Sequence, residues 1–235
     1  MITQQTDIEF LSGLAKSSVD LCLTDPPYII SKDSGMDRLL RSEDVDEKYG
    51  RKYAYATDYG DWDKDFTIND LDQSIYLIKR ALREGGSFIV FFDMWKLETL
   101  KNILEFHKFS KIRIVEWVKT NPVPVNSKAT YLSNAKEYAL SCVKGGKATF
   151  NSSYDNGIYS YPIYSGKDRF HPTQKSLPLF AELIEKHSNK GDLVIDPYAG
   201  SGTTMLAAAN TGRVGLGCEP NEEYFKLSKQ RLSNA

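Results

Sequence analysis

The chain has 235 residues, of which 41% are hydrophobic and 26% are charged, a balance typical of a globular protein with one large α/β domain. Its net charge of −1 gives no global sign of a nucleic-acid partner, no apolar run approaches the roughly 18 residues of a membrane span, and the first residues lack a signal pattern. The three cysteines (Cys22, Cys142 and Cys218) lie in apolar runs. We therefore expect neither disulfides nor a metal site, and we expect a reducing cytoplasm as the location.

The first half of the chain predicts alternating strands and helices. A short edge strand at residues 2–4 precedes a helix that Asp7 can cap, and a buried strand follows at residues 19–23. Residues 29–66 show no lasting periodicity, and a loop of this length is typical of a functional lid or of a poorly ordered segment. Apolar spacing then predicts a helix from Asp70 that Gly85-Gly86 ends, a strand at 87–92, a helix around 97–104, and strands at 112–118 and 138–143.

The second half is more regular. After a polar segment at residues 145–169, Ser176 can cap a helix, and a short buried strand follows at 193–196. A glycine-rich turn at 197–202 leads into a helix near Thr203, then a strand at 214–218 and a last helix capped by Asn221. This alternation predicts a single α/β domain with a mixed, mostly parallel sheet of about seven strands and helices on both faces.

The turn Asp25-Pro26-Pro27-Tyr28 follows the strand at 19–23, so we expect it at the carboxyl edge of the sheet, where open α/β folds bind ligands. The two prolines fix φ and remove both N–H donors, which leaves carbonyl oxygens in set directions. Together with the Asp25 carboxylate they form a rigid cluster of acceptors, and Tyr28 adds a flat aromatic face. Such a cluster suits an amino group on a planar ring.

A second candidate site begins where the strand at 193–196 ends. Gly200 and Gly202 allow the backbone to approach a ligand closely, and the helix behind them offers unpaired N–H groups. Glu219 ends the next strand, 23 residues after Asp196, where dinucleotide-binding folds place an acidic residue on ribose hydroxyls. Because Met205 stands where the phosphate-binding fingerprint needs its third glycine, an adenosine-containing cofactor without pyrophosphate fits better. Such a turn is also typical of a purely structural connection between strand and helix.

These two turns, together with His171-Pro-Thr-Gln-Lys175, resemble the beta group of DNA amino-methyltransferases that use S-adenosylmethionine. The motif order, with the catalytic turn first and the cofactor turn last, is that of the group. Trp117-Val-Lys119 and Glu137-Tyr138 also lie where the group has similar residues, so the resemblance covers nearly the whole chain. It implies a methyltransferase-like (Rossmann-like) fold in permuted order.

The resemblance also implies roles for individual residues. The catalytic turn would consist of Asp25, Pro26, Pro27 and Tyr28, with Asp25 as acceptor and orienter of the target amine and Tyr28 stacking on a base flipped from the duplex. Glu219 would bind the ribose and Asp7 the adenine of the cofactor, and His171 and Lys175 would lie near its carboxylate. The remaining cofactor contacts would come from Asp25 and from the glycine-rich turn, namely Asp196, Tyr198, Ala199, Gly200, Ser201, Gly202, Thr203 and Thr204. Asp7 and His171 can alternatively serve only as caps.

The function that follows is methyl transfer from S-adenosylmethionine to the N6 amino group of adenine in double-stranded DNA, without a metal. Asp before Pro-Pro-Tyr favours adenine; the alternatives are the N4 amino group of cytosine and a non-catalytic DNA-binding regulator. Residues 145–169 would form a short target-recognition segment, and residues 29–66 a lid that contacts DNA. A paired restriction endonuclease and a homodimer are left open as partners, and we expect no membrane.

Overall fold

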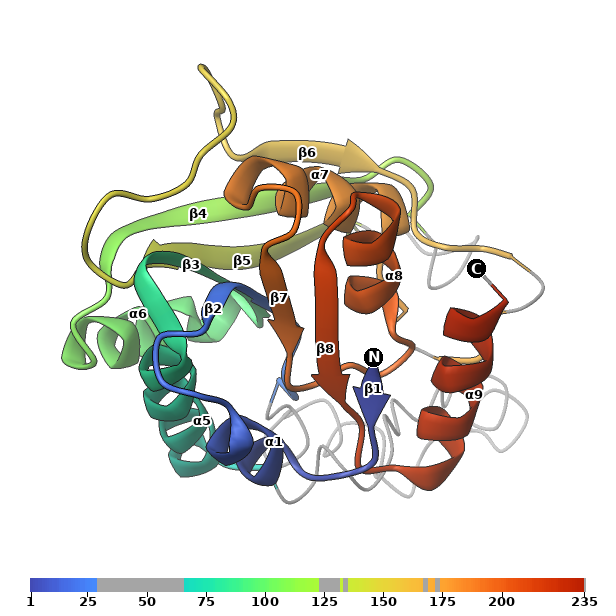
Figure 1. Ribbon diagram of the computed structural model, residues 1–235. Helices are drawn as coiled ribbons and strands as arrows, with labels where there is room; N and C mark the ends of the chain where they lie inside the picture. Colours follow the sequence, from blue (N-terminus) through green and yellow to red (C-terminus); the bar gives the residue numbers. More distant parts are fainter. Residues whose placement is uncertain (29–65, 123–131, 133–134, 167–168, 172–173, 235) are drawn as a thin grey trace, which may run out of the picture. The chain divides into compact units, whose positions relative to one another are not determined.

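A computed structural model describes residues 1–28, 66–122, 132, 135–166, 169–171 and 174–234 (Figure 1). Apart from Phe66, the predicted lid at 29–66 therefore lies outside the described residues. The chain divides into two units, one formed by Met1–Pro26 with Asp72–Ala235 and the other by Pro27–Leu71. In the second unit Thr67 and Asp70 form a reciprocal cap at the start of helix α5 (Ile68–Ala81), because the Thr67 amide donates to the Asp70 carboxylate and the Asp70 amide donates to the Thr67 hydroxyl.

The first unit is built on one sheet that has eight strands within the described part of the chain. Their order across the sheet is β1-β8-β7-β2-β3-β5-β4-β6 (Figure 1). All neighbouring pairs are parallel except those that involve β5, which is antiparallel to both β3 and β4. The strands are β1 (Ile2–Thr3), β2 (Val19–Thr24), β3 (Leu82–Phe92), β4 (Ser110–Lys119), β5 (Lys136–Val143), β6 (Ile158–Tyr161), β7 (Leu193–Asp196) and β8 (Val214–Cys218).

The mixed, mostly parallel sheet is confirmed, with one strand more than the sequence pattern predicts. The additional strand is β6, which lies in the polar segment at 145–169. Tyr159 is the one buried residue of this four-residue edge strand, so its apolar signal is too short to distinguish it from a loop.

The centre of the sheet is the point where the connections reverse direction. Strand β2 pairs with β7 in parallel, with Leu21 opposite Val194 and Cys22 opposite Ile195. From β2 the chain continues to β3 on one side, while from β7 it continues to β8 on the other side. Parallel sheets of this kind form a crevice at the carboxyl ends of such a strand pair. The catalytic turn after β2 and the glycine-rich turn after β7 therefore begin side by side.

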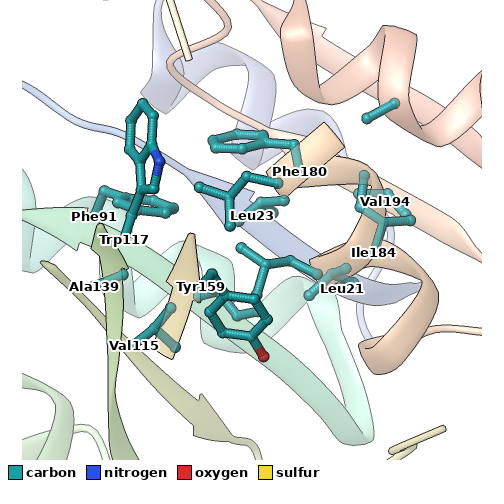
Figure 2. Close-up of a cluster of buried hydrophobic side chains, with 14 of the residues drawn as sticks. Leu21, Leu23, Phe91, Val115, Trp117, Ala139, Tyr159, Phe180, Ile184 and Val194 are labelled. Carbon is teal, nitrogen blue, oxygen red and sulfur yellow. The ribbon is translucent and has the colours of Figure 1, made fainter. Parts of the chain in front are cut away.

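Helices cover both faces of the sheet, as predicted. On one face α7 (Leu177–His187) and α8 (Thr203–Asn210) pack on a core that includes Leu21 and Leu23 of β2 and Phe180 of α7 (Figure 2). Each such buried side chain contributes about 1.5–3 kcal/mol. The other face carries Phe88, which stacks at a tilt on Phe109 just beyond α6. The remaining helices are α1 (Asp7–Gly13), η1 (Met94–Lys96, a 3-10 turn), α6 (Leu97–Phe106) and α9 (Glu222–Ser233).

Two local predictions are wrong and one is confirmed. Thr6, not Asp7, caps α1, because its side chain accepts from the Glu9 amide while Glu9 accepts from the Thr6 amide. Helix α5 ends at Ala81 rather than at Gly85-Gly86, and Gly85 lies inside β3 with a φ of +78°, where a Cβ would lie 2.2 Å from the Lys147 carbonyl oxygen. Asn221 caps α9 as predicted, since its side chain accepts from the Tyr224 amide.

No helix in the described ranges is long and apolar enough to cross a bilayer. All three cysteines are free and buried. Among the residues with described positions, no group of three or more His, Cys, Asp or Glu side chains is arranged to hold a metal ion.

Candidate active site

The carboxylate of Asp25 lies at the carboxyl end of β2 and is held by a buried lysine. The Lys175 ammonium lies 2.9 Å from Oδ2 of Asp25, and both side chains are largely buried. Pro26, the next residue, is buried as well. Pro27 and Tyr28 belong to the second unit, so their predicted part in the site follows from the sequence alone.

Lys175 connects Asp25 to two further charged side chains. Its ammonium lies 2.5 Å from Oε2 of Glu137 on β5, and Oε1 of the same carboxylate lies 2.8 Å from Nζ of Lys119 on β4. Burial alone lowers the pKa of Lys175, but Asp25 and Glu137 outweigh this effect and raise the pKa above its ordinary value. Likewise Lys175 and Lys119 overcome burial and lower the pKa of Glu137. Lys175 and Glu137 are therefore both charged at neutral pH.

The glycine-rich turn after β7 is held by side chains from α9. Gly200 and Gly202 both have positive φ angles, +48° and +75°, which glycine adopts without strain. Ser228 donates to the Gly200 carbonyl at 2.6 Å. Arg231 donates to the Ser201 carbonyl at 2.9 Å and to the Thr203 hydroxyl at 3.0 Å. The turn is thus fixed before any ligand binds.

Asp196 links the end of β2, where the catalytic turn begins, to the glycine-rich turn through hydrogen bonds. Its Oδ1 accepts from the hydroxyl of Thr24 at the end of β2 and from the Tyr198 amide, and its Oδ2 accepts from the Thr204 hydroxyl in the first turn of α8. Complete burial raises the pKa of Asp196 to about 6, although these hydrogen bonds oppose the shift. The geometry gives Asp196 a part in building the site, and its direct contact with a cofactor stays a prediction.

The raised pKa of Asp196 predicts a pH-dependent stability. The folded-state pKa is about 6 and the ordinary value is 3.8, so the folded protein binds a proton at Asp196 more tightly than the unfolded chain does. The resulting stabilisation of the folded state is present below pH 4 and is lost as the pH rises through 6. The loss is at most about 3 kcal/mol. We expect Asp196→Asn to remove this component, so that urea unfolding at pH 4 and pH 7 shows a smaller difference than in the wild type. An equal difference in both proteins would contradict the assignment.

Glu219 lies at the end of β8 and faces the glycine-rich turn. Its two carboxylate oxygens accept from the Gly200 amide at 3.0 Å and from the Asn221 amide at 2.9 Å. Burial raises the pKa of Glu219, the two backbone amides lower it, and nearby Asp196 raises it further. The carboxylate is therefore oriented by the backbone, as a residue that binds a pair of hydroxyl groups must be.

Asp7 joins the same region through Tyr198. Its Oδ2 accepts from the Tyr198 hydroxyl at 2.7 Å and from the Ser74 hydroxyl at 2.5 Å, and the two hydroxyls lie 2.9 Å apart. Besides burial, the negative charges of Asp196, Asp7 and Glu219 all raise the pKa of Cys218. Glu9 contributes to the same shift, so the carboxyl end of β8, where Cys218 lies, has a negative environment.

His171 is packed between the glycine-rich turn and α9. Its ring lies 4.4 Å from the ring of Tyr224, and a Cβ added to Gly200 would lie 3.2 Å from its Nε2. Burial and the charges of Lys175 and Arg169 lower the pKa of His171 to about 4. The imidazole is thus neutral at physiological pH, which favours a packing or hydrogen-bonding part over pairing with a cofactor carboxylate.

These residues fit an adenosine-containing cofactor. Oriented carboxylates at Glu219 and Asp7 can accept from ribose hydroxyls and an amino group, and the glycine-rich turn lets the backbone approach a ligand. The sequence interpretation assigned no role to Ser74, Arg231, Ser228 or Thr24. Single polar residues inside helices or at strand ends carry no pattern of their own, so only the fold reveals them.

Replacing Gly200 by alanine tests the close approach at this turn. An L-residue at positive φ costs about 1–2 kcal/mol, and the new Cβ would also press on His171. Gly191→Ala is the matched control, because Gly191 has a φ of +86° with no atom within 4 Å of the added Cβ. We expect both variants to lose stability in urea unfolding, but only Gly200→Ala to lose cofactor affinity by calorimetry. Equal affinities in the two variants would contradict a role for the turn in binding.

Comparisons with known proteins agree with this geometry. Residues 19–230 match the N6_N4_Mtase family, which is described as DNA methylase. The chain is 29% identical to the type II methyltransferase M2.MboI of Moraxella bovis over 98% of this chain and 86% of that protein, and 31% identical to M.HinfI of Haemophilus influenzae over 96% of this chain and 66% of that protein. The chain belongs to the DNA methylase family, and the resemblance drawn from its motifs is confirmed.

Solved structures show the same fold. The complex of M1.HpyAVI with S-adenosylmethionine superposes with a TM-score of 0.71 and 27% identity, and the alignment covers 99% of this chain and 98% of that one. The cytosine-N4-specific PvuII DNA methyltransferase has a TM-score of 0.72 at 17% identity, with 98% of this chain and 85% of that one covered. The latter likeness shows the fold alone. The methyltransferase-like α/β fold predicted from the sequence is confirmed.

Proposed function

We propose that this protein transfers the methyl group of S-adenosylmethionine to the N6 amino group of adenine within a short DNA sequence. One observation carries the proposal: the Asp25 carboxylate and the glycine-rich turn lie at the ends of two paired strands, β2 and β7, joined through the bond from Thr24 to Asp196. An acceptor for an amino group and a site for an adenosine cofactor therefore open at one edge of the sheet.

The amino nitrogen of adenine is a weak nucleophile, and the acceptors of the catalytic turn would make it a better one. The lone pair of an adenine amino nitrogen is delocalised into the ring. Asp25 and the Pro26 carbonyl accept hydrogen bonds from the two N–H groups, which favours a pyramidal nitrogen with its lone pair directed away from the ring. Holding the nitrogen in this orientation supplies much of the rate gain. Tyr28 stacks on the base once it has left the duplex.

S-adenosylmethionine, when bound, supplies an electrophilic methyl group on a sulfonium. In the proposed arrangement Glu219 accepts from the ribose hydroxyls and Asp7 from the adenine amino group, while backbone groups from Ala199 to Thr204 surround the methionine portion. The backbone bonds at Glu219 and the Tyr198–Asp7 contact support these roles because they fix both carboxylates. Transfer would form the new N–C bond as the S–C bond of the sulfonium breaks, which leaves a neutral thioether, and the methylated nitrogen would then release one proton to water.

Adenine is favoured over cytosine because Asp rather than Ser or Asn precedes Pro26-Pro27-Tyr28. A non-catalytic DNA-binding regulator on the same fold is the other alternative, and the complete set of Asp25, Gly200, Gly202 and Glu219 argues against it. We further propose that residues 145–169 take part in reading the target sequence and that the lid at 29–66 contacts DNA.

Several broader properties follow from the same proposal. The chain would act as a single methyltransferase domain from residue 1 to 235. Relatives named type II methyltransferases suggest a restriction-modification system with a cognate endonuclease as partner. Because those relatives come from bacteria, whose DNA lies in the cytoplasm, we propose a cytoplasmic location. A homodimer is the proposed alternative to a monomer.

The test is direct identification of the modified base. Purified protein is incubated with methyl-labelled S-adenosylmethionine and unmethylated plasmid, and the DNA is digested to nucleosides for mass spectrometry. We expect labelled N6-methyladenine, which Asp25→Ala protein does not produce. Label in N4-methylcytosine would establish the alternative base, and DNA binding without label would favour the regulator. Sequencing of the modified plasmid then gives the recognition site.

A further inference from the structure

We propose that Lys175 is a positioning residue for the target-amine acceptor Asp25, and that Glu137 and Lys119 hold Lys175 in place. The inference rests on the proposed function and deepens it. It replaces the contact between Lys175 and the cofactor carboxylate that the sequence resemblance implies with a contact to the catalytic turn.

The geometry of the four charges supports this role. They alternate in sign from β2 to β4: Asp25 to Lys175 is 2.9 Å, Lys175 to Glu137 is 2.5 Å, and Glu137 to Lys119 is 2.8 Å. Lys175 is 7% exposed, so its ammonium is almost fully removed from water. This ammonium also lies over the ring of Phe91 on β3, 5.4 Å from the ring centroid, which is a cation–π contact.

Two of the three donors of the Lys175 ammonium point to carboxylates, so its position is determined from both sides. Glu137 is itself fixed by the sheet, because it pairs with Trp117 in the ladder between β5 and β4. The arrangement is therefore a rigid support that begins in the sheet and ends on Asp25. A lysine that bound only the cofactor would need no such support from β4 and β5.

The support acts on Asp25 in two ways. A fixed cation at 2.9 Å from Oδ2 restricts rotation of the carboxylate and so sets the direction from which it accepts the amino group. The same cation favours the ionised form of Asp25, and only the ionised carboxylate is purely an acceptor. Other charged or titratable groups face this region: the charge of Asp25 contributes to the raised pKa of Asp196 at the end of β7, and the charges of Lys175 and Arg169 contribute to the lowered pKa of His171.

Substitution of Lys175 by methionine separates the positioning role from cofactor binding. We expect kcat to fall by at least about tenfold and the acidic limb of its pH profile to move to higher pH, while the calorimetric Kd for S-adenosylmethionine stays within about threefold of the wild type. Lys175→Arg keeps the charge and should recover part of kcat and the original pH limb. A merely structural lysine would not move the pH limb.

A second variant guards against loss of folding. Lys175→Met removes the cation beside Asp25 and leaves Glu137 with Lys119 alone, which destabilises the buried cluster, so Lys175→Met with Glu137→Gln is made as well. This double variant still lacks the cation at Asp25, and we expect the same displaced pH limb. Lys186→Met is the matched control, because Lys186 also bridges two carboxylates, those of Asp155 and Glu182, but away from Asp25. At saturating DNA its kcat should match the wild type.

The outcomes distinguish this inference from the proposed function. If the wild type forms no N6-methyladenine, the proposed function is wrong. If the wild type is active and the double variant keeps the wild-type kcat and pH profile, the positioning role is wrong. A Kd for S-adenosylmethionine raised about tenfold or more with kcat unchanged would likewise overturn it and return Lys175 to the cofactor.

Discussion

Asp25→Ala protein should bind S-adenosylmethionine and show no measurable methylation of DNA. Removing a preorganised acceptor at a reacting centre typically lowers kcat by about 10²–10³-fold, and here the alanine also leaves the Lys175 ammonium with one carboxylate partner fewer. The measurement is the rate of label transfer at saturating DNA and cofactor, with the Kd for S-adenosylmethionine determined by calorimetry on the same preparation. We expect the Kd to rise moderately at most, because Asp25 mainly orients the target amine.

Asp25→Asn is the informative control. It keeps the shape of the side chain and one acceptor but loses the charge that pairs with Lys175. If charge and orientation both matter, this variant should also be severely impaired, although it should fold as stably as Asp25→Ala or better. Turnover at a tenth of the wild-type rate or higher in Asp25→Ala would be incompatible with the assigned role.

Glu219→Ala is expected to weaken S-adenosylmethionine binding by about 1.5–3 kcal/mol, or tenfold and more in Kd, because it removes charge-assisted hydrogen bonds to a pair of hydroxyls. The alanine also leaves the Gly200 and Asn221 amides without their acceptor, so part of the loss comes from a less ordered turn. Glu219→Gln separates the two effects, because its amide oxygen can still accept from one backbone N–H. An unchanged Kd in Glu219→Ala would mean that the carboxylate only supports the turn.

The pH dependence of the Kd gives an independent check. Burial raises the pKa of Glu219, so its carboxylate becomes protonated at a higher pH than an exposed glutamate does. A protonated Glu219 accepts hydroxyl donors poorly. Affinity for S-adenosylmethionine should therefore decline on acidification in the wild type, and this part of the decline should be absent in Glu219→Gln.

The sheet could be predicted from sequence because its central strands are short, apolar and separated by clear turn signals. Strand β7 has only four residues, Leu193–Asp196, yet the glycine-rich turn behind it marks its end. Strand β6 escaped prediction because it lies at an edge, is half exposed, and sits among Gly, Ser and Asn residues that also form loops. The spacing from Thr6 to Glu9 is that of a capping box, so the cap at Thr6 could be predicted from the sequence. The prediction failed because the neighbouring Asp7 is also a residue type that favours the N-cap position.

The site was predictable only in part. Turns that combine glycine or proline with a carboxylate are local patterns, so Asp25, Gly200 and Glu219 could be selected from the sequence. The partner of Asp25 could not, because Lys175 lies 150 residues away and no local pattern specifies which carboxylate a lysine will meet. The same holds for Glu137, which the resemblance marked without a role, and for Arg231, whose helix shows only an amphipathic pattern.

The hydrogen bond from Thr24 to Asp196 joins two strands that emerge from the ribosome at very different times. The two residues are 172 positions apart, and β2 and β7 are neighbours in the middle of the sheet. A chain that leaves the ribosome from its N-terminus exposes β2 long before β7 exists, so the centre of the sheet stays open through most of synthesis. The edge of β2 and its apolar side chains need protection during this interval. Since the proposed cofactor turn is also among the last parts to emerge, we expect truncated chains that lack it not to methylate DNA.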